Sequence, residues 1–449
     1  MSNKLINTEK RFALCTLGCK VNQEESVALG NVFKEQGWRR VAFEDEADVY
    51  IVNSCTVTHL ADRKSRQMLR RAVRTNPQAL VVATGCYAQV GKEEISDIEG
   101  VDLIVGTNDR YRLFAYVQRH LGEKQQPPQV YVTPTAEVKD FKNMGNLNND
   151  TARERAFLKI EDGCSQFCSY CIIPYARGPV RSRPLSDILA EARELVAKGY
   201  QEIVLTGIHT GAYGTDLEDG SSLAAVAAAL AAIPGLHRLR LGSVEPQEVT
   251  NRLIQVIAEN PNICHHLHIP LQACDDEIIK KMNRHYTVDF YADLLANIRK
   301  NLDNAAVTTD LIVGFPGETP EIFERSLKRL AELKFADMHI FPYSRRQGTP
   351  AAVLPNQISP EVKSAEVKVV SALRDEMKLA FWQEQVGRKL EILTEQEIFL
   401  GDKAYMTGHS PNYLPLAVAA AESGRLAPGQ IYQLKICEIK GNYLIGKII

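Results

Sequence analysis

The sequence has no long hydrophobic run, no hydrophobic leader and almost no net charge. Nowhere do ~18 uncharged apolar residues follow one another, as a transmembrane helix requires. The closest stretch, residues 221–236, is mostly alanine and is interrupted by Pro234. Residues 1–11 are polar and lack the apolar core of a signal peptide. We therefore expect a cytoplasmic protein with no membrane partner.

Composition excludes some classes and leaves others open. The 449 residues include 53 Lys and Arg against 55 Asp and Glu, a net charge of −2, so a nucleic-acid partner would need a local basic face. Hydrophobic residues make up 45% and charged residues 24%, which excludes a disordered or fibrous chain. The sequence contains no internal repeat or low-complexity tract. At ~150 residues per domain, the length predicts about three domains.

The order of apolar runs and helical patterns predicts an α/β fold. Residues 10–122 alternate buried strands with helices, which is typical of an open parallel α/β domain, and polar residues 123–152 are interpreted as a linker. Six βα repeats in residues 153–383 predict a partial (β/α)6 barrel. Residues 384–449 hold short β-like runs separated by Gly and Pro, which predicts a small antiparallel β-barrel.

The expected elements follow from these patterns. In the first domain we predict strands at residues 12–17, 49–52, 80–84 and 101–105, and helices at 22–36, 57–74, 87–97 and up to about 120. In the barrel we predict strands at 157–160, 202–205, 238–241, 265–269, 307–313 and 337–341. In the last domain we predict strands at 390–394, 414–418, 431–439 and 443–449.

Three of the ten cysteines are clustered, in the order Cys164-Ser-Gln-Phe-Cys168-Ser-Tyr-Cys171. Disulfides are rare in a cytosolic chain, so metal ligation or catalysis is the better explanation for cysteines in organised spacing. Three thiolates on one tight loop can hold three irons of a four-iron cube and leave the fourth iron open. A structural zinc site is the alternative, but no histidine lies within thirty residues to complete it.

A second group of cysteines is separated in sequence but shares one setting. Cys19, Cys55 and Cys86 each come directly after a predicted strand. Because the carboxyl ends of neighbouring parallel strands line one crevice, these three thiols are expected to converge on a second cluster. Burial as small apolar side chains is the alternative. Cys15 lies inside its strand, where alternation places it on the same face as Leu17 and not at the strand end. Cys264, Cys274 and Cys437 have no partner at ligand spacing and are interpreted as structural.

Basic residues suggest an RNA-binding face. Arg63, Arg66, Arg70 and Arg74 recur on one side of a predicted helix, a pattern that would hold a phosphate backbone, although a solvated helix face would look the same. Further candidate RNA contacts are Arg177, Arg181 and Arg183 beyond the clustered cysteines, and Tyr413 for base stacking. His266 and His268 share a strand face without an accompanying carboxylate, so we expect a barrel-interior position for His268 and no metal role.

The clustered cysteines and their place after a strand resemble the radical S-adenosylmethionine (SAM) superfamily. The resemblance implies that a [4Fe–4S] cluster on Cys164, Cys168 and Cys171 binds SAM and cleaves it to a 5′-deoxyadenosyl radical. It also implies that Tyr170 lies beside the adenine. The other matching positions are Thr206 and Gly207 for the SAM amino group, Ser243 and Glu245 for the ribose, and Gly314 for close backbone approach.

Two cysteine triads followed by a terminal β domain resemble the methylthiotransferases over nearly the whole chain. That resemblance implies two [4Fe–4S] clusters, an N-terminal one carrying the sulfur and a SAM-binding one supplying the radical. It implies a terminal TRAM domain, with the motif around Gly408 to Tyr413 and the closing Gly446. It further implies SAM as methyl donor, a flavodoxin- or ferredoxin-like electron donor and a sulfur source.

The residues after Cys19 indicate the branch. The segment Lys20-Val21-Asn22-Gln23 resembles the corresponding segment of the enzymes that convert N6-threonylcarbamoyladenosine at position 37 of tRNA to its 2-methylthio form. The implied partner is the tRNA anticodon stem-loop and not DNA. The alternatives are the isopentenyladenosine-tRNA enzyme, the modifier of a ribosomal-protein aspartate, and a non-catalytic iron–sulfur RNA-binding protein. A two-cluster electron carrier is disfavoured, because such a carrier needs fully ligated clusters and no barrel.

Overall fold

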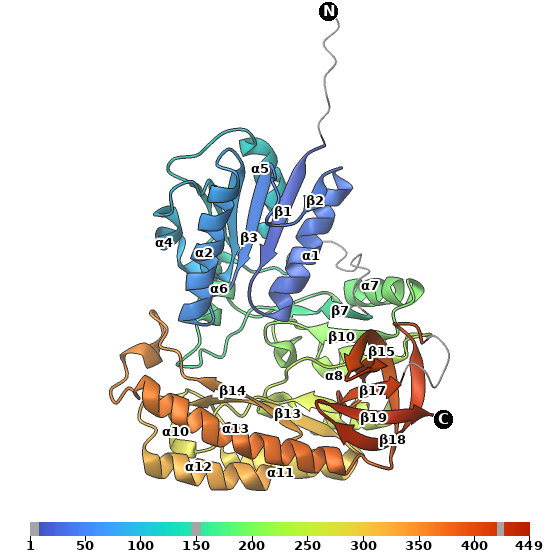
Figure 1. Ribbon diagram of the computed structural model, residues 1–449. Helices are drawn as coiled ribbons and strands as arrows, with labels where there is room; N and C mark the ends of the chain where they lie inside the picture. The colour runs from blue at the N-terminus through green and yellow to red at the C-terminus, as the bar shows by residue number, and fades with distance from the viewer. Residues whose placement is uncertain (1–8, 145–153, 420–425) are drawn as a thin grey trace, which may run out of the picture. The chain divides into compact units, whose positions relative to one another are not determined.

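The computed structural model describes residues 9–144, 154–419 and 426–449 (Figure 1). The chain divides into two compact units. The first comprises residues 1–150, 162–183 and 344–349, and the second comprises residues 151–161, 184–343 and 350–449. The loop with the clustered cysteines therefore belongs to the same unit as the N-terminal cysteines, whereas the sequence analysis placed it with the barrel.

Among the described residues of the first unit, six strands form one parallel sheet in the order β2-β1-β3-β4-β5-β6. Its central strands are buried on both faces, which explains their continuous apolar runs. The strands are β1 (Arg11–Thr16), β2 (Arg39–Val41), β3 (Val49–Ser54), β4 (Leu80–Gly85), β5 (Leu103–Val105) and β6 (Gln129–Tyr131).

Helices cover both faces of this sheet. One core contains Phe12 and Leu14 with side chains of α1 and α5, and the other contains Ala13 and Tyr50 with side chains of α2, α3 and α4. The helices are α1 (Lys20–Glu35), α2 (His59–Thr75), α3 (Cys86–Val90), α4 (Lys92–Ser96), α5 (Leu113–His120) and α6 (Ile173–Arg177). Single-turn helices η1 (Arg110–Arg112) and η2 (Thr135–Glu137) complete the unit.

Three details of this unit differ from the sequence prediction. The helix predicted over residues 87–97 breaks at Gly91, where a Cβ would lie 2.4 Å from a ring carbon of Tyr87. The predicted linker contributes edge strand β6, which pairs with β5. The short edge strand β2 was not predicted, because it has only three residues and two of them are exposed arginines.

The second unit contains the predicted six parallel strands in two three-stranded sheets, β7-β10-β11 and β12-β13-β14. Bridges from Leu239 to Ile263 and from Ser243 to His268 join the two sheets, so the strands follow one another in chain order. The strands are β7 (Arg155–Lys159), β10 (Glu202–Thr206), β11 (Arg238–Arg240), β12 (His266–His268), β13 (Ala306–Val313) and β14 (Asp337–Pro342).

Helices follow these strands, and all of them except α7 begin at hydroxyl or carboxyl caps, such as Thr250 before α9 and Ser359 before α13. The helices are α7 (Leu185–Ala197), α8 (Leu223–Ala231), α9 (Asn251–Glu259), α10 (Asp276–Lys281), α11 (Val288–Asn301), α12 (Pro320–Leu333) and α13 (Pro360–Gln383). Shorter elements of this unit are η3 (Thr210–Ala212), η4 (Pro246–Glu248) and η5 (Pro350–Val353). Strand β9 (Arg181–Ser182) belongs to the first unit, and the division between the units falls within β8 (Glu161–Asp162). No helix in the described ranges has the length and hydropathy to cross a membrane.

The C-terminal strands of the second unit close into a barrel in the order β15-β16-β17-β19-β18. All pairs are antiparallel except β17 with β19, which is parallel, and β16 was not predicted. The strands are β15 (Lys389–Leu400), β16 (Lys403–His409), β17 (Pro415–Ala419), β18 (Ile431–Lys440) and β19 (Tyr443–Ile448).

Buried arginines of β11 form hydrogen bonds that attach this small barrel to the parallel strands of the same unit. Arg238 donates to the carbonyl of His409 at 3.0 Å, and Arg240 donates to the carbonyl of Pro411 at 2.8 Å. Arg240 also donates to Glu202 at 2.6 Å. Burial alone would raise the pKa of Glu202, but the neighbouring arginines, Arg240 above all, lower the pKa to about 2. The joint between β11 and the C-terminal barrel is therefore a buried network of charged side chains.

Candidate active site

The three N-terminal cysteines lie at the carboxyl ends of adjacent strands β1, β3 and β4. Cys19 precedes α1, Cys55 follows β3, and Cys86 begins α3. Burial, with smaller contributions from the charges of Cys86 and Cys19, raises the pKa of the Cys55 thiol to about 11 against opposing backbone hydrogen bonds. The three thiols therefore lie at the same edge of the sheet, where they can act as ligands of one metal cluster.

Polar side chains fix the loops that carry these thiols. Asn22 donates at 2.9 Å to the carbonyls of Leu17 and Ser54, and so joins the loops that bear Cys19 and Cys55. Asn53 donates back to the carbonyl of Asn22 at 2.9 Å. Buried amides with satisfied hydrogen bonds specify one arrangement of the loops.

Glycine is required between Leu17 and Cys19. Gly18 has φ +100°, and a Cβ there would lie 2.6 Å from Cβ and 2.7 Å from Sγ of Cys55. Because Gly18 has no side chain, its backbone can lie directly against Cys55, and the neighbouring Cys19 is thereby placed close to Cys55.

Arg177 lies against the same cysteines. It has no exposed surface, and its Nε donates to Sγ of Cys86 at 3.2 Å. The same guanidinium donates to Glu25 at 2.6 Å and to Asn22 at 2.6 Å. Burial raises the pKa of the Cys86 thiol, whereas the positive charge of Arg177 lowers it. Arg177 therefore favours the thiolate form of Cys86, which is the form that ligates iron.

The clustered cysteines lie on a constrained loop of the same unit. The backbone N–H of Cys164 donates to Gly178 at 2.9 Å, and that of Cys171 donates to Cys168 at 2.9 Å. Gly163 has φ +94° and no space for a Cβ, which would lie 1.9 Å from the carbonyl oxygen of Pro179. Tyr170 is half-buried on this loop.

The two cysteine groups approach each other through their helices. Helix α3 begins at Cys86 and packs against α6, which starts two residues after Cys171. Thr107, near the end of β5, donates to the carbonyl of Ala176 in α6 at 2.7 Å. The first unit therefore brings together two sets of three thiols, and each set matches in donor type and number a four-iron cube with one open iron.

The predicted SAM contacts of the second unit lie at strand ends. Thr206 ends β10, and a Cβ on Gly207 would lie 2.6 Å from a carboxylate oxygen of Glu161. Ser243 follows β11, and its carbonyl accepts from Thr210 at 2.5 Å. Glu245 is ion-paired with Arg284, so its carboxylate has a protein partner. The contacts of Glu161 and Arg284 were not anticipated from sequence, because neither residue lies in a recognised motif.

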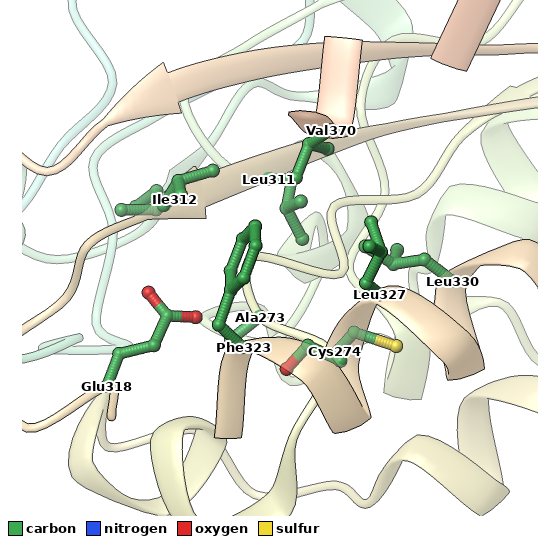
Figure 2. Close-up of a pocket in the computed structure, with 11 residues that line it drawn as sticks. Ala273, Cys274, Leu311, Ile312, Glu318, Phe323, Leu327, Leu330 and Val370 are labelled. Carbon is green, nitrogen blue, oxygen red and sulfur yellow. The ribbon is translucent and has the colours of Figure 1, made fainter. Parts of the chain in front are cut away.

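Gly314 lies beyond β13 with φ +71°, and its N–H donates to Glu318 at 2.6 Å. Glu318 lines a cavity of about 10 Å³ beside Cys274, with Phe323, Leu327 and Leu330 (Figure 2). Burial raises the pKa of Glu318 to about 7 and that of the Cys274 thiol to about 12. The cavity holds about one water molecule and is too small for a cofactor. Cys274 is thus a core residue, as predicted.

Cys15 is half-buried and packs against the core. It packs against the cluster that contains Ala13 and Val52, and burial raises the pKa of its thiol. Its position inside β1, beside Val52 of β3 in the sheet register, agrees with the prediction from strand alternation.

The predicted basic face is correct only in part. Arg63, Arg70 and Arg74 are exposed on α2, whereas Arg66 is half-buried and donates to Glu94 at 2.7 Å. The assignment of Arg177, Arg181 and Arg183 to RNA binding is wrong, because all three side chains are buried. Arg181, for example, donates to the carbonyls of Arg177 and Pro179. The scarcity of acids around these arginines in the sequence suggested exposure, but Arg177 pairs with the distant Glu25 at 2.6 Å and with Asp162 at 3.3 Å.

Tyr413 does not lie on an open surface either. Its ring stacks on His266 at 4.9 Å and on His409 at 4.8 Å, with the Arg240 guanidinium 4.8 Å from the ring centre. These neighbours occupy the ring, so the base-stacking role predicted for Tyr413 has no support from its surroundings. Tyr413 packs in the joint between β11 and the C-terminal barrel.

The expectation that no further ligand accompanies His268 is also wrong. Asp310 of β13 and His339 of β14 present ligand atoms within 4.8 Å of one another and of His268. Neighbouring strands bring these three residues together, whereas in the sequence they lie far apart.

Comparisons with known proteins identify the family of the chain. The Radical SAM superfamily profile matches residues 158–330, and the profile of the uncharacterized protein family UPF0004 matches residues 11–106. The radical SAM methyltransferase TsrM of Kitasatospora setae shares the fold, with a TM-score of 0.55 at 15% identity over 77% of each chain. Fold and cysteine loop together define a radical SAM enzyme, a class that uses a [4Fe–4S] cluster and SAM.

Relatives of nearly equal length narrow the class. The threonylcarbamoyladenosine tRNA methylthiotransferase MtaB of Bacillus subtilis is 40% identical over 438 residues, which is 97% of this chain and 96% of that protein. The tRNA-2-methylthio-N(6)-dimethylallyladenosine synthase of Clostridium novyi is 33% identical over 98% of this chain and 97% of its own length. The chain belongs to the radical SAM methylthiotransferases, and within them to the MtaB type.

Proposed function

We propose that this enzyme adds a methylthio group to C2 of N6-threonylcarbamoyladenosine at position 37, beside the anticodon of tRNA. The observation that carries the proposal is the pairing of two cysteine triads in one compact unit through α3, α6 and the Arg177–Cys86 contact. A non-catalytic RNA-binding protein would have no need for two open three-thiol sets, and an electron carrier would need fully ligated clusters.

In this proposal the residues around the cysteines position the cluster ligands and set the charge around them. When bound, a cluster on Cys164, Cys168 and Cys171 together with SAM supplies radical activation of C2, and a cluster on Cys19, Cys55 and Cys86 supplies the sulfur. Asn22 and Gly18 hold Cys19 beside Cys55, while Arg177 donates a hydrogen bond to Sγ of Cys86 and its positive charge opposes the effect of burial on that thiol's pKa. A flavodoxin- or ferredoxin-like protein would deliver electrons, and a separate sulfur source would refill the first cluster.

The exposed residues of α2 are proposed to bind the tRNA backbone. Arg63, Arg70 and Arg74 lie on one helical face, and α2 begins four residues after Cys55. A phosphate backbone held there would bring the anticodon loop to the end of the sheet that carries the first cysteine triad. Single-stranded loops let a base splay outward at low cost, which modification at C2 requires.

Two observations support threonylcarbamoyladenosine as the substrate. The first is the Lys20-Val21-Asn22-Gln23 segment after Cys19, and the second is the name of the 40% identical Bacillus subtilis relative. Isopentenyladenosine is the second candidate, because the 33% identical Clostridium novyi relative is named for the dimethylallyl substrate.

The test uses anaerobically reconstituted enzyme and two anticodon stem-loops that differ only at position 37. With SAM and a reductant, mass spectrometry should find the 2-methylthio product from threonylcarbamoyladenosine and none from isopentenyladenosine. Triple alanine replacement of Cys19, Cys55 and Cys86 should abolish methylthiolation but retain reductive SAM cleavage. Triple replacement of Cys164, Cys168 and Cys171 should abolish both. Product from the isopentenyl stem-loop alone would reject the proposed substrate.

A further inference from the structure

Three metal-ligating side chains meet on one face of the sheet β12-β13-β14. In the parallel register His268 pairs with Thr308, and Asp310 pairs with His339. Since Thr308 and Asp310 are two residues apart on β13, their side chains point to the same face. Along β13 the alternate residues Val307, Thr309 and Leu311 are buried, so the ligands occupy the opposite, partly exposed face.

The distances suit a small cation. Nε2 of His268 lies 3.3 Å from a carboxylate oxygen of Asp310, and one ligand atom from each of the three residues lies within 4.8 Å of the other two. Neighbouring ligands of a tetrahedral zinc ion with bonds of ~2.1 Å are separated by about 3.4 Å. The Asp310–His268 edge already has this length, and the side chain of His339 is exposed, with its ligand atom within 4.8 Å of the other two.

The surroundings orient the first ligand. Nδ1 of His268 forms a hydrogen bond with Oγ1 of Thr308 at 2.9 Å, which leaves Nε2 directed toward Asp310. Metal-binding histidines commonly have their second nitrogen fixed in this way. The side chains of His268 and Asp310 retain 17% and 29% of their exposure, so an ion and an additional ligand can reach them.

We propose that His268, Asp310 and His339 bind one divalent transition-metal ion of the zinc class and leave a coordination position open. Two imidazoles and one carboxylate select zinc-like ions over calcium or magnesium, which prefer all-oxygen sites. The donor set also separates this site from the cysteine triads, whose ligands are sulfur. His268 is bridged in register to Ser243, so the ion would lie on the barrel wall next to a predicted SAM contact of the same unit.

The test is zinc K-edge X-ray absorption on the full-length protein after both cysteine triads have been loaded with iron and sulfide. Wild type is expected to retain about one zinc per chain after desalting, with nitrogen and oxygen ligands at ~2.0–2.1 Å and no sulfur at ~2.3 Å. The variants His268→Ala, Asp310→Asn and His339→Gln should each lose that zinc. His339→Gln changes an exposed side chain and is therefore the variant that best preserves folding.

His265→Ala is the matched control. His265 immediately precedes the same strand and is half-buried, and its Nδ1 contacts the carbonyl of Asp303, away from the three ligands. This variant should keep its zinc. The proposal is overturned if the wild type holds no zinc, if the bound zinc has sulfur ligands, or if folded His339→Gln retains zinc with an unchanged absorption edge.

Discussion

Replacement of Gly18 by alanine tests the geometry of the first cysteine triad. The new Cβ would lie 2.6 Å from Cβ and 2.7 Å from Sγ of Cys55, whereas carbon atoms in contact prefer ~3.5–4.0 Å. The overlap of roughly 1 Å must displace Cys55 or the loop that bears Cys19. Gly18 also has φ +100°, where a side chain costs about 1–2 kcal/mol. With about 1–3 kcal/mol for overpacking, the total destabilisation should be about 2–5 kcal/mol.

The assay is iron and sulfide content after anaerobic reconstitution. Gly18→Ala should hold about four irons per chain in place of about eight, while reductive cleavage of SAM on the second triad persists. Two controls separate the causes. Gly37 has φ +80° and open space, so Gly37→Ala carries the backbone cost alone. Gly30 lies in α1 with open space, so Gly30→Ala should be neutral or stabilising by up to about 1 kcal/mol. Full iron content in Gly18→Ala would refute the proposed convergence of Cys19 on Cys55.

Three further predictions follow from individual side chains. Cys15→Ala should keep the iron content of the wild type and lower the unfolding free energy by at most ~1–2 kcal/mol, because Cys15 only packs against the core. Loss of four irons in this variant would show that Cys15 is a cluster ligand. Joint replacement of Arg63, Arg70 and Arg74 by glutamine should weaken tRNA binding and reduce the slope of log affinity against log salt by about 2–3. Arg252→Gln, which changes an exposed arginine of α9, is the control. An unchanged slope in the triple variant would place the RNA elsewhere. Burial raises the pKa of Glu318 from 4.5 to about 7, so the folded state binds the proton more tightly. The unfolding free energy should therefore fall by at most about 3 kcal/mol as pH rises from about 4.5 to 7. In Glu318→Gln, the thermal midpoint should depend less on pH over this range. An unchanged pH profile in that variant would show that Glu318 does not titrate in this range.

The sequence predicted the features that depend on local pattern. Continuous apolar runs such as Val49 to Ser54 identify central parallel strands, and a cysteine directly after such a strand lies at the sheet edge. Alternation along β1 separated Cys15 from Cys19 for the same reason. The predicted edge elements were less complete, because β2 and β6 are short and partly exposed and so lack a distinct hydrophobic period.

Contacts between residues that are far apart in the chain could not be predicted from the sequence. Arg177 looks like a surface cation in the printed chain, yet Glu25, far away in sequence, makes its burial possible. His268 looks isolated until the strand register sets Asp310 and His339 beside it. In each case the partner is supplied by tertiary packing, which periodicity and spacing do not encode.

The most direct test of the proposed reaction is the modified-nucleoside profile of tRNA from cells with and without this gene. Mass spectrometry should show 2-methylthio-N6-threonylcarbamoyladenosine in the parent strain. Only its unmethylthiolated precursor should remain in the deletion strain, and the plasmid-borne gene should restore the product. If the 2-methylthio form of threonylcarbamoyladenosine persisted in the deletion strain while that of isopentenyladenosine disappeared, the proposed substrate would be wrong.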